Sequence, residues 1–123
     1  MSEKRVVCLN CMDGRVQLPV INYIKECHGV DYVDMITEPG MDGILSDEGK
    51  NIDAIKQKIV ISIDKNSASM IFIVGHFDCR GNPVDDPSHK DQISLSVDRI
   101  RKEFEGITAS GLWVNESWEV KEV

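Results

Sequence analysis

Two apolar runs, each ending in a motif of thiol, imidazole or charged side chains, constrain the fold of this chain more than any other feature. Residues 6–9 lead into Cys-Met-Asp-Gly-Arg at 11–15, and residues 70–74 lead into Gly-His-Phe-Asp-Cys at 75–79. Continuous apolar runs are typical of parallel strands, because helices cover both faces of such a sheet. Sites in open α/β sheets lie at the carboxyl ends of the strands. The two motifs are therefore predicted to lie at that edge of one sheet.

The segments around these runs alternate between strand-like and helix-like patterns. Pro19 suits the first turn of a helix and Gly29 suits its end. Turn-forming residues make 37–43 a predicted loop, and two prolines with two adjacent aspartates do the same for 80–90. We predict strands over residues 5–10, 31–36, 69–74 and 111–118, helices over residues 19–28, 51–66 and 91–105, and a short extension over residues 119–123.

This alternation implies a mainly parallel sheet with right-handed crossovers. The predicted fold class is α/β, with three layers: a mainly parallel sheet of four to five strands and helices on both faces. The length of 123 residues suits a single domain over residues 1–123.

Charge and hydropathy exclude several classes of partner. The net charge of −7 argues against nucleic acid and against anionic membrane surfaces. No apolar run approaches the ~20 residues of a membrane-spanning helix. The N-terminal residues lack the long apolar region and small-residue cleavage site of a signal peptide. We therefore expect a cytoplasmic protein that binds a small molecule.

Four cysteines in a cytoplasmic chain favour free thiols or metal ligands over disulfides. Cys8 and Cys11 form a Cys-x-x-Cys pattern, but strand side chains alternate between faces. Cys8 is therefore predicted to be a core thiol, with Cys11 beyond the end of the strand, and Cys27 is predicted to be structural. Two Cys and one His, with a fourth ligand or water, is a composition typical of zinc sites.

The paired motifs Cys-x-Asp-x-Arg and His-x-x-Cys, each after an apolar strand, resemble those of the β-class carbonic anhydrases. The resemblance implies that Cys11, His76 and Cys79 are the zinc ligands. It also implies the strand order 2-1-3-4 and a carboxylate–guanidinium pair, Asp13 and Arg15, beside the metal. With Asp13 on zinc the site would be closed, and with Asp13 on Arg15 a water would enter.

Three protein ligands leave a fourth position on zinc for water, whose pKa then falls to about 7. The resemblance thus implies a carbonic anhydrase, a zinc lyase that converts carbon dioxide reversibly to bicarbonate and a proton, as a homodimer or higher homo-oligomer. Two residues are candidates for substrate binding. Gly40 is the one residue of the segment 37–40 that matches the family, and Gln17 is a candidate by proximity.

Alternatives to this interpretation stay open. The chain could be a catalytically inactive zinc-binding protein that binds bicarbonate or a partner, with Asp13 fixed on the metal. It could instead hydrolyse a related small molecule such as carbonyl sulfide. Asp13 and Arg15 could also form a purely structural ion pair that holds the turn.

Other residues near the motifs have simpler expectations. Asp78 is predicted to be a helix N-cap, and Gly14 to give the first motif backbone conformations that other residues resist. We expect solvated positions at helix ends for His28 and His89. Two tryptophans, Trp113 and Trp118, are expected to serve packing or an interface.

Overall fold

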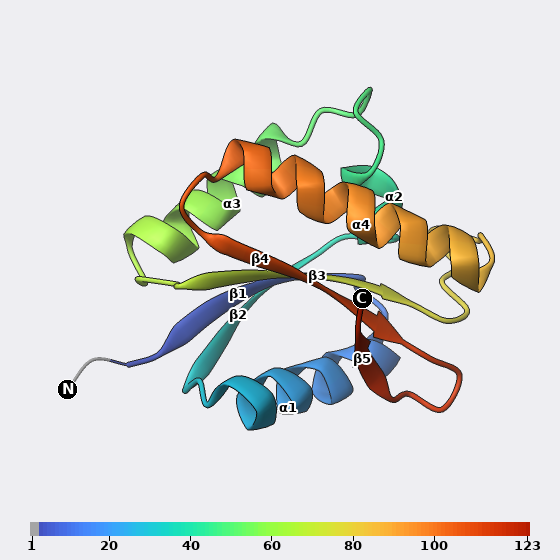
Figure 1. Cartoon of the computed structure of the whole chain (residues 1–123), viewed down its shortest axis with the longest axis horizontal. Coiled ribbons are helices and arrows are strands. Elements are labelled where there is room, and N and C mark those ends of the chain that lie inside the picture. The colour runs from blue at the N-terminus through green and yellow to red at the C-terminus, as the bar shows by residue number, and fades with distance from the viewer. Residues whose placement is uncertain (1–2) are drawn as a thin grey trace.

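The computed structural model describes residues 3–123 and confirms the α/β fold class (Figure 1). Strands and helices alternate through most of the chain, as the apolar patterns predict. The elements in order are β1 (Arg5–Asn10), the 3₁₀ helix η1 (Gly14–Val16), α1 (Gln17–His28), β2 (Tyr32–Thr37), α2 (Met41–Leu45), α3 (Asp53–Asp64), β3 (Met70–His76), α4 (Asp86–Glu103), β4 (Thr108–Val114) and β5 (Val120–Glu122).

The sheet has the order β2-β1-β3-β4-β5. Its first four strands are parallel, and β5 pairs antiparallel with β4. The expected order 2-1-3-4 is therefore confirmed, with β5 added at the edge. The chain leaves β1 toward β2 on one side and returns to β3 on the other, so β1 and β3 are neighbours at the switch point where α/β sheets bind ligands.

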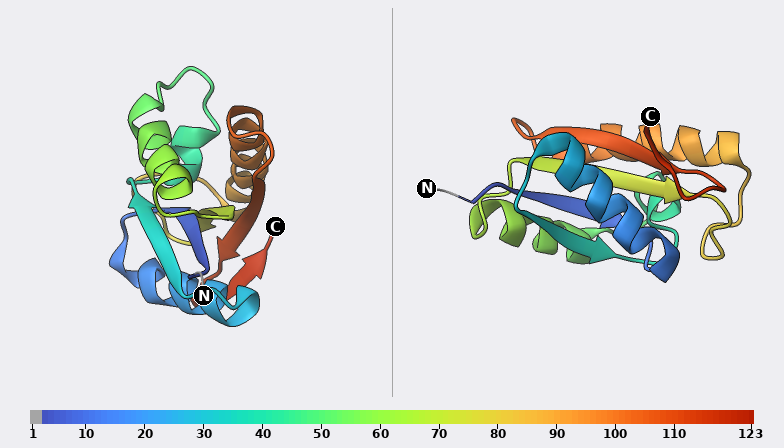
Figure 2. Two further views of the ribbon diagram at one scale, coloured as in Figure 1. Left: turned by 90° about the vertical axis from the view of Figure 1, so that its left-hand side faces the viewer. Right: turned by 90° about the horizontal axis from the view of Figure 1, so that it is seen from below.

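Helices cover both faces of the sheet, with α1 on one face and α2, α3 and α4 on the other (Figures 1 and 2). Each face has its own apolar cluster. The β1 and β3 residues facing α2, α3 and α4 are Val7, Leu9, Ile71 and Ile73, and those facing α1 are Val6, Cys8, Phe72 and Val74. Both sides of these strands are thus buried, which explains their uninterrupted apolar sequence.

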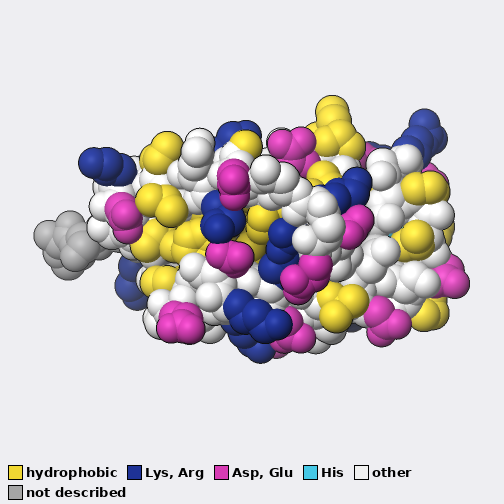
Figure 3. Space-filling view, turned by 90° about the horizontal axis from the view of Figure 1, so that it is seen from above, with side chains coloured by type: hydrophobic (Ala, Val, Ile, Leu, Met, Phe, Trp, Pro, Cys, Tyr) yellow, Lys and Arg dark blue, Asp and Glu magenta, His cyan; other side chains and the backbone are white. Residues whose placement is uncertain are grey.

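Basic and acidic side chains are mixed on the face of the molecule over α3 and α4, with apolar side chains between them (Figure 3). Within residues 3–123, no helix is both long and apolar enough to cross a membrane.

Two boundaries around the second motif differ from prediction. β3 continues to His76 rather than ending at residue 74, so the imidazole is carried by the strand itself. α4 begins at Asp86, inside the segment 80–90 that was predicted to be a loop. Pro87 does not prevent the helix, because the first turn needs no backbone N–H from it. The Asp85 side chain caps the helix by accepting from the backbone N–H of Ser88 at 2.8 Å.

The predicted strand over residues 111–118 is wrong at both ends. β4 starts earlier, at Thr108, and ends at Val114. A turn follows, in which the Asn115 side chain accepts from the backbone N–H groups of Ser117 and Glu119, both at 3.0 Å. The chain then reverses into β5, so residues 120–122 of the expected extension form an edge strand.

Helices α1 and α3 lie close to their predicted positions, and Gly29 ends α1 in a left-handed conformation, as expected. α2 is an addition: its five residues begin inside the predicted loop over residues 37–43. A helix this short has too few turns to show periodic apolar spacing.

Candidate metal centre

Three side chains from the two motifs meet at the carboxyl ends of β1 and β3. The potential ligand atoms of Cys11, His76 and Cys79 all lie within 4.8 Å of one another, and the two sulfur atoms are 3.9 Å apart. Cys11 directly follows β1, His76 is the last residue of β3, and Cys79 lies in the turn beyond it. All three residues are buried, with at most 4% of their surface exposed. The sequence-predicted ligands are therefore brought together.

The His76 ring is fixed in the form that a metal requires. Its Nδ1 atom lies 2.7 Å from the carbonyl oxygen of Phe77. A carbonyl can only accept, so Nδ1 carries the proton and Nε2 keeps its lone pair. Nε2 is buried and has no hydrogen-bond partner among residues 3–123. Metal-bound histidines commonly donate from the other ring nitrogen in this way, so the three residues fit a metal ion.

The sulfur atoms of Cys11 and Cys79 lie 3.9 Å apart, within hydrogen-bond distance of each other. The hydrogen bond with Cys79 lowers the pKa of Cys11 against the effect of burial, and the backbone N–H groups of Gly40 and Asp13 lower it further. The pKa of Cys79 is raised for the same reason, because its proton is held by the Cys11 sulfur. The pair thus offers a thiolate at Cys11, and a thiolate is the form that binds metal.

The other cysteines lie away from this centre. Cys8 is fully buried in β1, and burial raises the pKa of its thiol. It is a core thiol, as predicted. Cys27 is exposed on α1, where the prediction of a structural role finds no support.

Asp13 is bound to Arg15. Its carboxylate accepts from Arg15 Nη2 at 2.6 Å, from Nε at 3.1 Å and from the backbone N–H at 2.9 Å. These hydrogen bonds lower the pKa of Asp13 to about 2. Among the described residues, the group that could hold a metal ion consists of Cys11, His76 and Cys79 and does not include Asp13. Of the two arrangements that the resemblance implies, this is the one with the carboxylate on Arg15.

Arg15 has further contacts that hold its guanidinium in place, one of them from Nη2 to the backbone carbonyl of Asp78 at 3.1 Å. Its Nη1 donates to Asp78 at 3.1 Å, and its guanidinium carbon lies 4.7 Å from the centre of the Trp118 ring. Asp78 is therefore not a helix N-cap, since Asp85 occupies that position. Trp118 contacts the candidate site rather than only packing the last strand.

The shape of the first motif comes from side chains, not from glycine. Gly14 has no positive φ, and a Cβ added there would meet no described atom within 4 Å. The Gln17 amide instead donates to the carbonyls of Cys11 and Asp13, at 2.7 and 2.8 Å. Asn10, which no motif indicated, accepts from the Cys11 N–H at 2.8 Å. The expectation for Gly14 is thus wrong.

Gly40 lies against the metal centre through its backbone. Its φ is +63°, and an added Cβ would lie 2.7 Å from Asn82 Cβ and 2.8 Å from Gly81 O. Only glycine fits this position, next to the Cys11 sulfur that its N–H faces. The substrate roles of Gly40 and Gln17 stay predictions.

His89 differs most from its expectation. It is 1% exposed rather than solvated, because α4 starts earlier than predicted and turns the ring toward the sheet. Its Nδ1 lies 2.6 Å from the carboxylate of Asp42, a residue that no motif indicated. His28 is half-buried, with its ring edge-on to Phe72 at a centroid distance of 5.0 Å.

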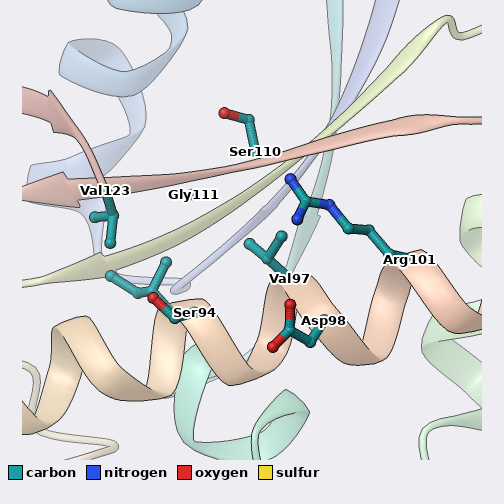
Figure 4. A pocket seen from close by; sticks show the side chains of 8 residues that line it. Ser94, Val97, Asp98, Arg101, Ser110, Gly111 and Val123 are labelled. Carbon is teal, nitrogen blue, oxygen red and sulfur yellow. The ribbon is translucent and has the colours of Figure 1, made fainter.

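Two surface hollows lie beside residues of the two motifs. One is lined by Asp13, Gly14, Arg15 and Arg80, and another includes Cys79. A separate hollow between α4 and β4 is lined by residues such as Val97, Asp98 and Arg101 and by none of the sequence-predicted site residues (Figure 4).

Comparisons with known proteins agree with this architecture. A family model described as "Putative carbonic anhydrase" matches residues 1–123. No curated protein matches the chain. The solved β-carbonic anhydrase CafA of the fungal pathogen Aspergillus fumigatus is 11% identical, with a TM-score of 0.56 over 99% of this chain and 76% of that one.

Two other solved structures give similar values. Tetrameric β-carbonic anhydrases from the filamentous ascomycete Sordaria macrospora match at 11% identity and a TM-score of 0.57, over 100% of this chain and 82% of the other. The β-carbonic anhydrase CcaA matches at 15% identity and a TM-score of 0.56, over 98% and 80%. At these identities the likeness concerns the fold.

Proposed function

The chain belongs to the carbonic anhydrase family whose model matches residues 1–123, and on that premise we propose that it is a zinc-dependent carbonic anhydrase of the β type. In this proposal it converts carbon dioxide and water reversibly to bicarbonate and a proton. One observation carries the proposal: the Nε2 of His76, which has no hydrogen-bond partner among residues 3–123, lies within 4.8 Å of two cysteine sulfurs. That donor set is typical of zinc.

Cys11, His76 and Cys79 would hold the ion. When bound, zinc supplies the Lewis acidity that makes a water molecule a nucleophile near neutral pH. Two thiolates donate more charge than imidazoles would, so the groups around the ligands have more influence on that acidity. The Phe77 carbonyl contributes by fixing the His76 ring, and the N–H of Gly40 by stabilising charge on Cys11.

Asp13 is the proposed hydrogen-bond acceptor for the reacting water. Because Arg15 lowers its pKa to about 2, the carboxyl stays ionised at neutral pH and can accept but not donate. Arg15 would also keep the Asp13 carboxylate from binding an ion held by Cys11, His76 and Cys79. In turn, Asp78 and Trp118 hold Arg15. These contacts hold Asp13 on Arg15. They therefore favour the open site over the inactive alternative, in which Asp13 would bind the metal.

The proposal extends to assembly and location. We infer a homodimer or higher homo-oligomer, since tetrameric β-carbonic anhydrases are among the structures that share the fold. A cytoplasmic location is supported by the four free cysteines of the described chain, which suit a reducing compartment.

Stopped-flow measurement of carbon dioxide hydration tests the reaction. We expect zinc-loaded protein to give a rate that rises between about pH 6.5 and about pH 9, and Asp13→Ala to lose it. Absence of any rate above buffer, with zinc fully bound, would contradict the proposal. Such protein would then be assayed with carbonyl sulfide and for bicarbonate binding.

A further inference from the structure

Asp42 is the only carboxylate in the buried set of residues 3–123, with 1% of its surface exposed. Three donors from different parts of the chain satisfy it. His89 Nδ1 lies 2.6 Å from Oδ2, while the N–H of Gly43 and the side-chain amide of Asn82 each donate to Oδ1 at 3.0 Å. The carboxylate thus links α2, the loop after β3 and the first turn of α4.

Asn82 connects this carboxylate to a candidate metal ligand. It lies three residues after Cys79 in the loop between β3 and α4, and its backbone N–H donates to the Cys79 carbonyl at 3.3 Å. Its side-chain amide also donates to Gln92 at 2.6 Å. The loop has no regular secondary structure, so side-chain hydrogen bonds of this kind must fix its position.

Glycines let the linked segments approach without intervening side chains. A Cβ on Gly75 would lie 2.5 Å from Asp42 Oδ2, and one on Gly43 would lie 2.7 Å from Asn82 Cγ. Gly75 directly precedes His76. Asp42 therefore contacts the backbone beside one candidate ligand and, through Asn82, the loop that carries another.

The His89 ring has no other hydrogen-bond partner among the described residues. Its Nε2 is buried and unpartnered within the described residues, and its ring contacts Trp113 at a centroid distance of 5.5 Å. A buried carboxylate is costly to desolvate. An apolar side chain could fill the space at position 42, but it could not accept from Asn82.

We propose that Asp42 is a positioning residue for the metal centre, which acts through Asn82 to hold Cys79 at binding distance from Cys11 and His76. This inference rests on the proposed zinc site. Loss of such an outer partner commonly lowers metal affinity about 10- to 100-fold. We expect a loss of that size for Asp42→Ala and for Asn82→Ala.

The conservative variant Asp42→Asn separates positioning from charge. Its amide oxygen can still accept from Gly43 and Asn82, and its amide nitrogen can donate to His89 in the other tautomer. We expect it to restore zinc affinity to within about threefold of the wild-type value, which is well inside the loss expected for an outer partner.

Asp34→Ala is the matched control. Asp34 also holds a network of hydrogen bonds, from Arg5, Ser62 and Asn66. It lies on β2 and pairs in register with Val7 of β1. Val7 is four residues before Cys11, so Asp34 lies away from the metal centre. Its loss should lower the free energy of unfolding and leave zinc affinity unchanged.

The experiment is a zinc competition titration with a chromogenic chelator, on metal-free proteins whose folding is checked by circular dichroism. The thiolate-to-metal absorption of the cobalt(II) forms is the second readout, and it should change in Asp42→Ala but not in Asp34→Ala. Asn82→Ala provides the same test if Asp42→Ala does not fold.

The outcomes separate the inference from the proposal on which it rests. Wild-type protein that binds zinc, with Asp42→Ala or Asn82→Ala binding it as tightly, would overturn the inference alone. An equal loss of zinc affinity in Asp34→Ala would also overturn the inference. The loss would then follow from lower stability of the fold and not from the position of Cys79. Wild-type protein that binds no zinc would overturn the metal site and the inference together.

Discussion

His76 Nδ1 lies 2.7 Å from the carbonyl oxygen of Phe77, the next residue in the chain. This hydrogen bond determines which ring nitrogen is available, because the carbonyl can only accept and Nδ1 must therefore be the donor. Nε2 is left with a lone pair and, within residues 3–123, without a partner. A buried acceptor without a partner costs about 1–3 kcal/mol, and a metal ion would remove that cost.

Substitution of the ligands should separate the metal site from core packing. Cys11→Ser, His76→Ala and Cys79→Ser should each lose zinc, as measured by elemental analysis of purified protein. Cys8→Ser should keep zinc, although a buried hydroxyl at this fully enclosed position costs about 1–3 kcal/mol. Exposed Cys27 is the second control, and its replacement by Ser should change neither zinc content nor stability. Zinc loss in a folded Cys8→Ser protein would refute this ligand assignment.

Arg15→Ala should abolish turnover without removing the metal. The Asp13 carboxylate would lose its three contacts to the guanidinium and become free to take the fourth position on zinc. Hydration rates and zinc content measured on the same samples check this.

Asp78→Ala removes the outer carboxylate that accepts from Arg15, in a pair whose two side chains are 39% and 47% exposed, and leaves the Asp78 backbone carbonyl and the Trp118 ring in contact with the guanidinium. Such exposed pairs contribute about 0–1 kcal/mol, so its rate should stay close to the wild-type rate. Turnover that survived in Arg15→Ala would exclude Arg15 from the mechanism.

Acid should destabilise the fold in part through Asp34. Burial alone would raise the pKa of this carboxyl, but hydrogen bonds from Ser62, Asn66 and Arg5 outweigh it and lower the pKa below 3.8. The stabilisation is present above the unfolded-state pKa and is lost as pH falls through the lower folded-state pKa. Urea unfolding of metal-free protein, followed by circular dichroism at several pH values, measures this.

The comparison variant is Asp34→Asn, which cannot titrate. Its unfolding free energy should fall less steeply than that of the wild type as pH drops below about 4. Parallel pH profiles for the two proteins would show that Asp34 has no such role.

Gly75→Ala should destabilise the fold, whereas Gly14→Ala should not. A Cβ at Gly75 would lie 2.5 Å from Asp42 Oδ2 and 2.8 Å from Ile93 Cδ1, and overpacking of this kind costs about 1–3 kcal/mol. The open space at Gly14 makes it the control. Urea midpoints of the two variants should therefore differ clearly, and equal midpoints would disprove the close packing at Gly75.

The meeting of Cys11, His76 and Cys79 was predictable because these residues follow directly from the two apolar runs. Parallel strands bring their carboxyl ends to one edge, so Cys11 and His76 had to approach once β1 and β3 were neighbours. The early start of α4 was missed because Pro87 suggested a loop. The same residue is acceptable in the first turn, where Asp85 caps the helix. Residues 115–118 belong to a predicted strand, but the Asn115 side chain forms a turn there by accepting from the backbone N–H of Ser117.

The Asp42–His89 contact could not be predicted from the sequence. The two residues are 47 positions apart. Asp42 lies on α2, which is too short to show periodic apolar spacing. His89 lies in the first turn of α4, within a segment that the sequence predicts to be a loop. Their proximity depends on how α2 and α4 pack over the sheet. Neither residue type nor spacing along the chain carries that information.

X-ray absorption at the zinc edge, on wild-type protein loaded with zinc, tests the account most directly. We expect two sulfur atoms at about 2.3 Å, one imidazole nitrogen at about 2.0–2.1 Å and one further light atom. That result would match Cys11, Cys79 and His76 with one position left for water or a carboxylate. Three or more sulfur atoms, or protein that retains no zinc, would contradict the centre described here.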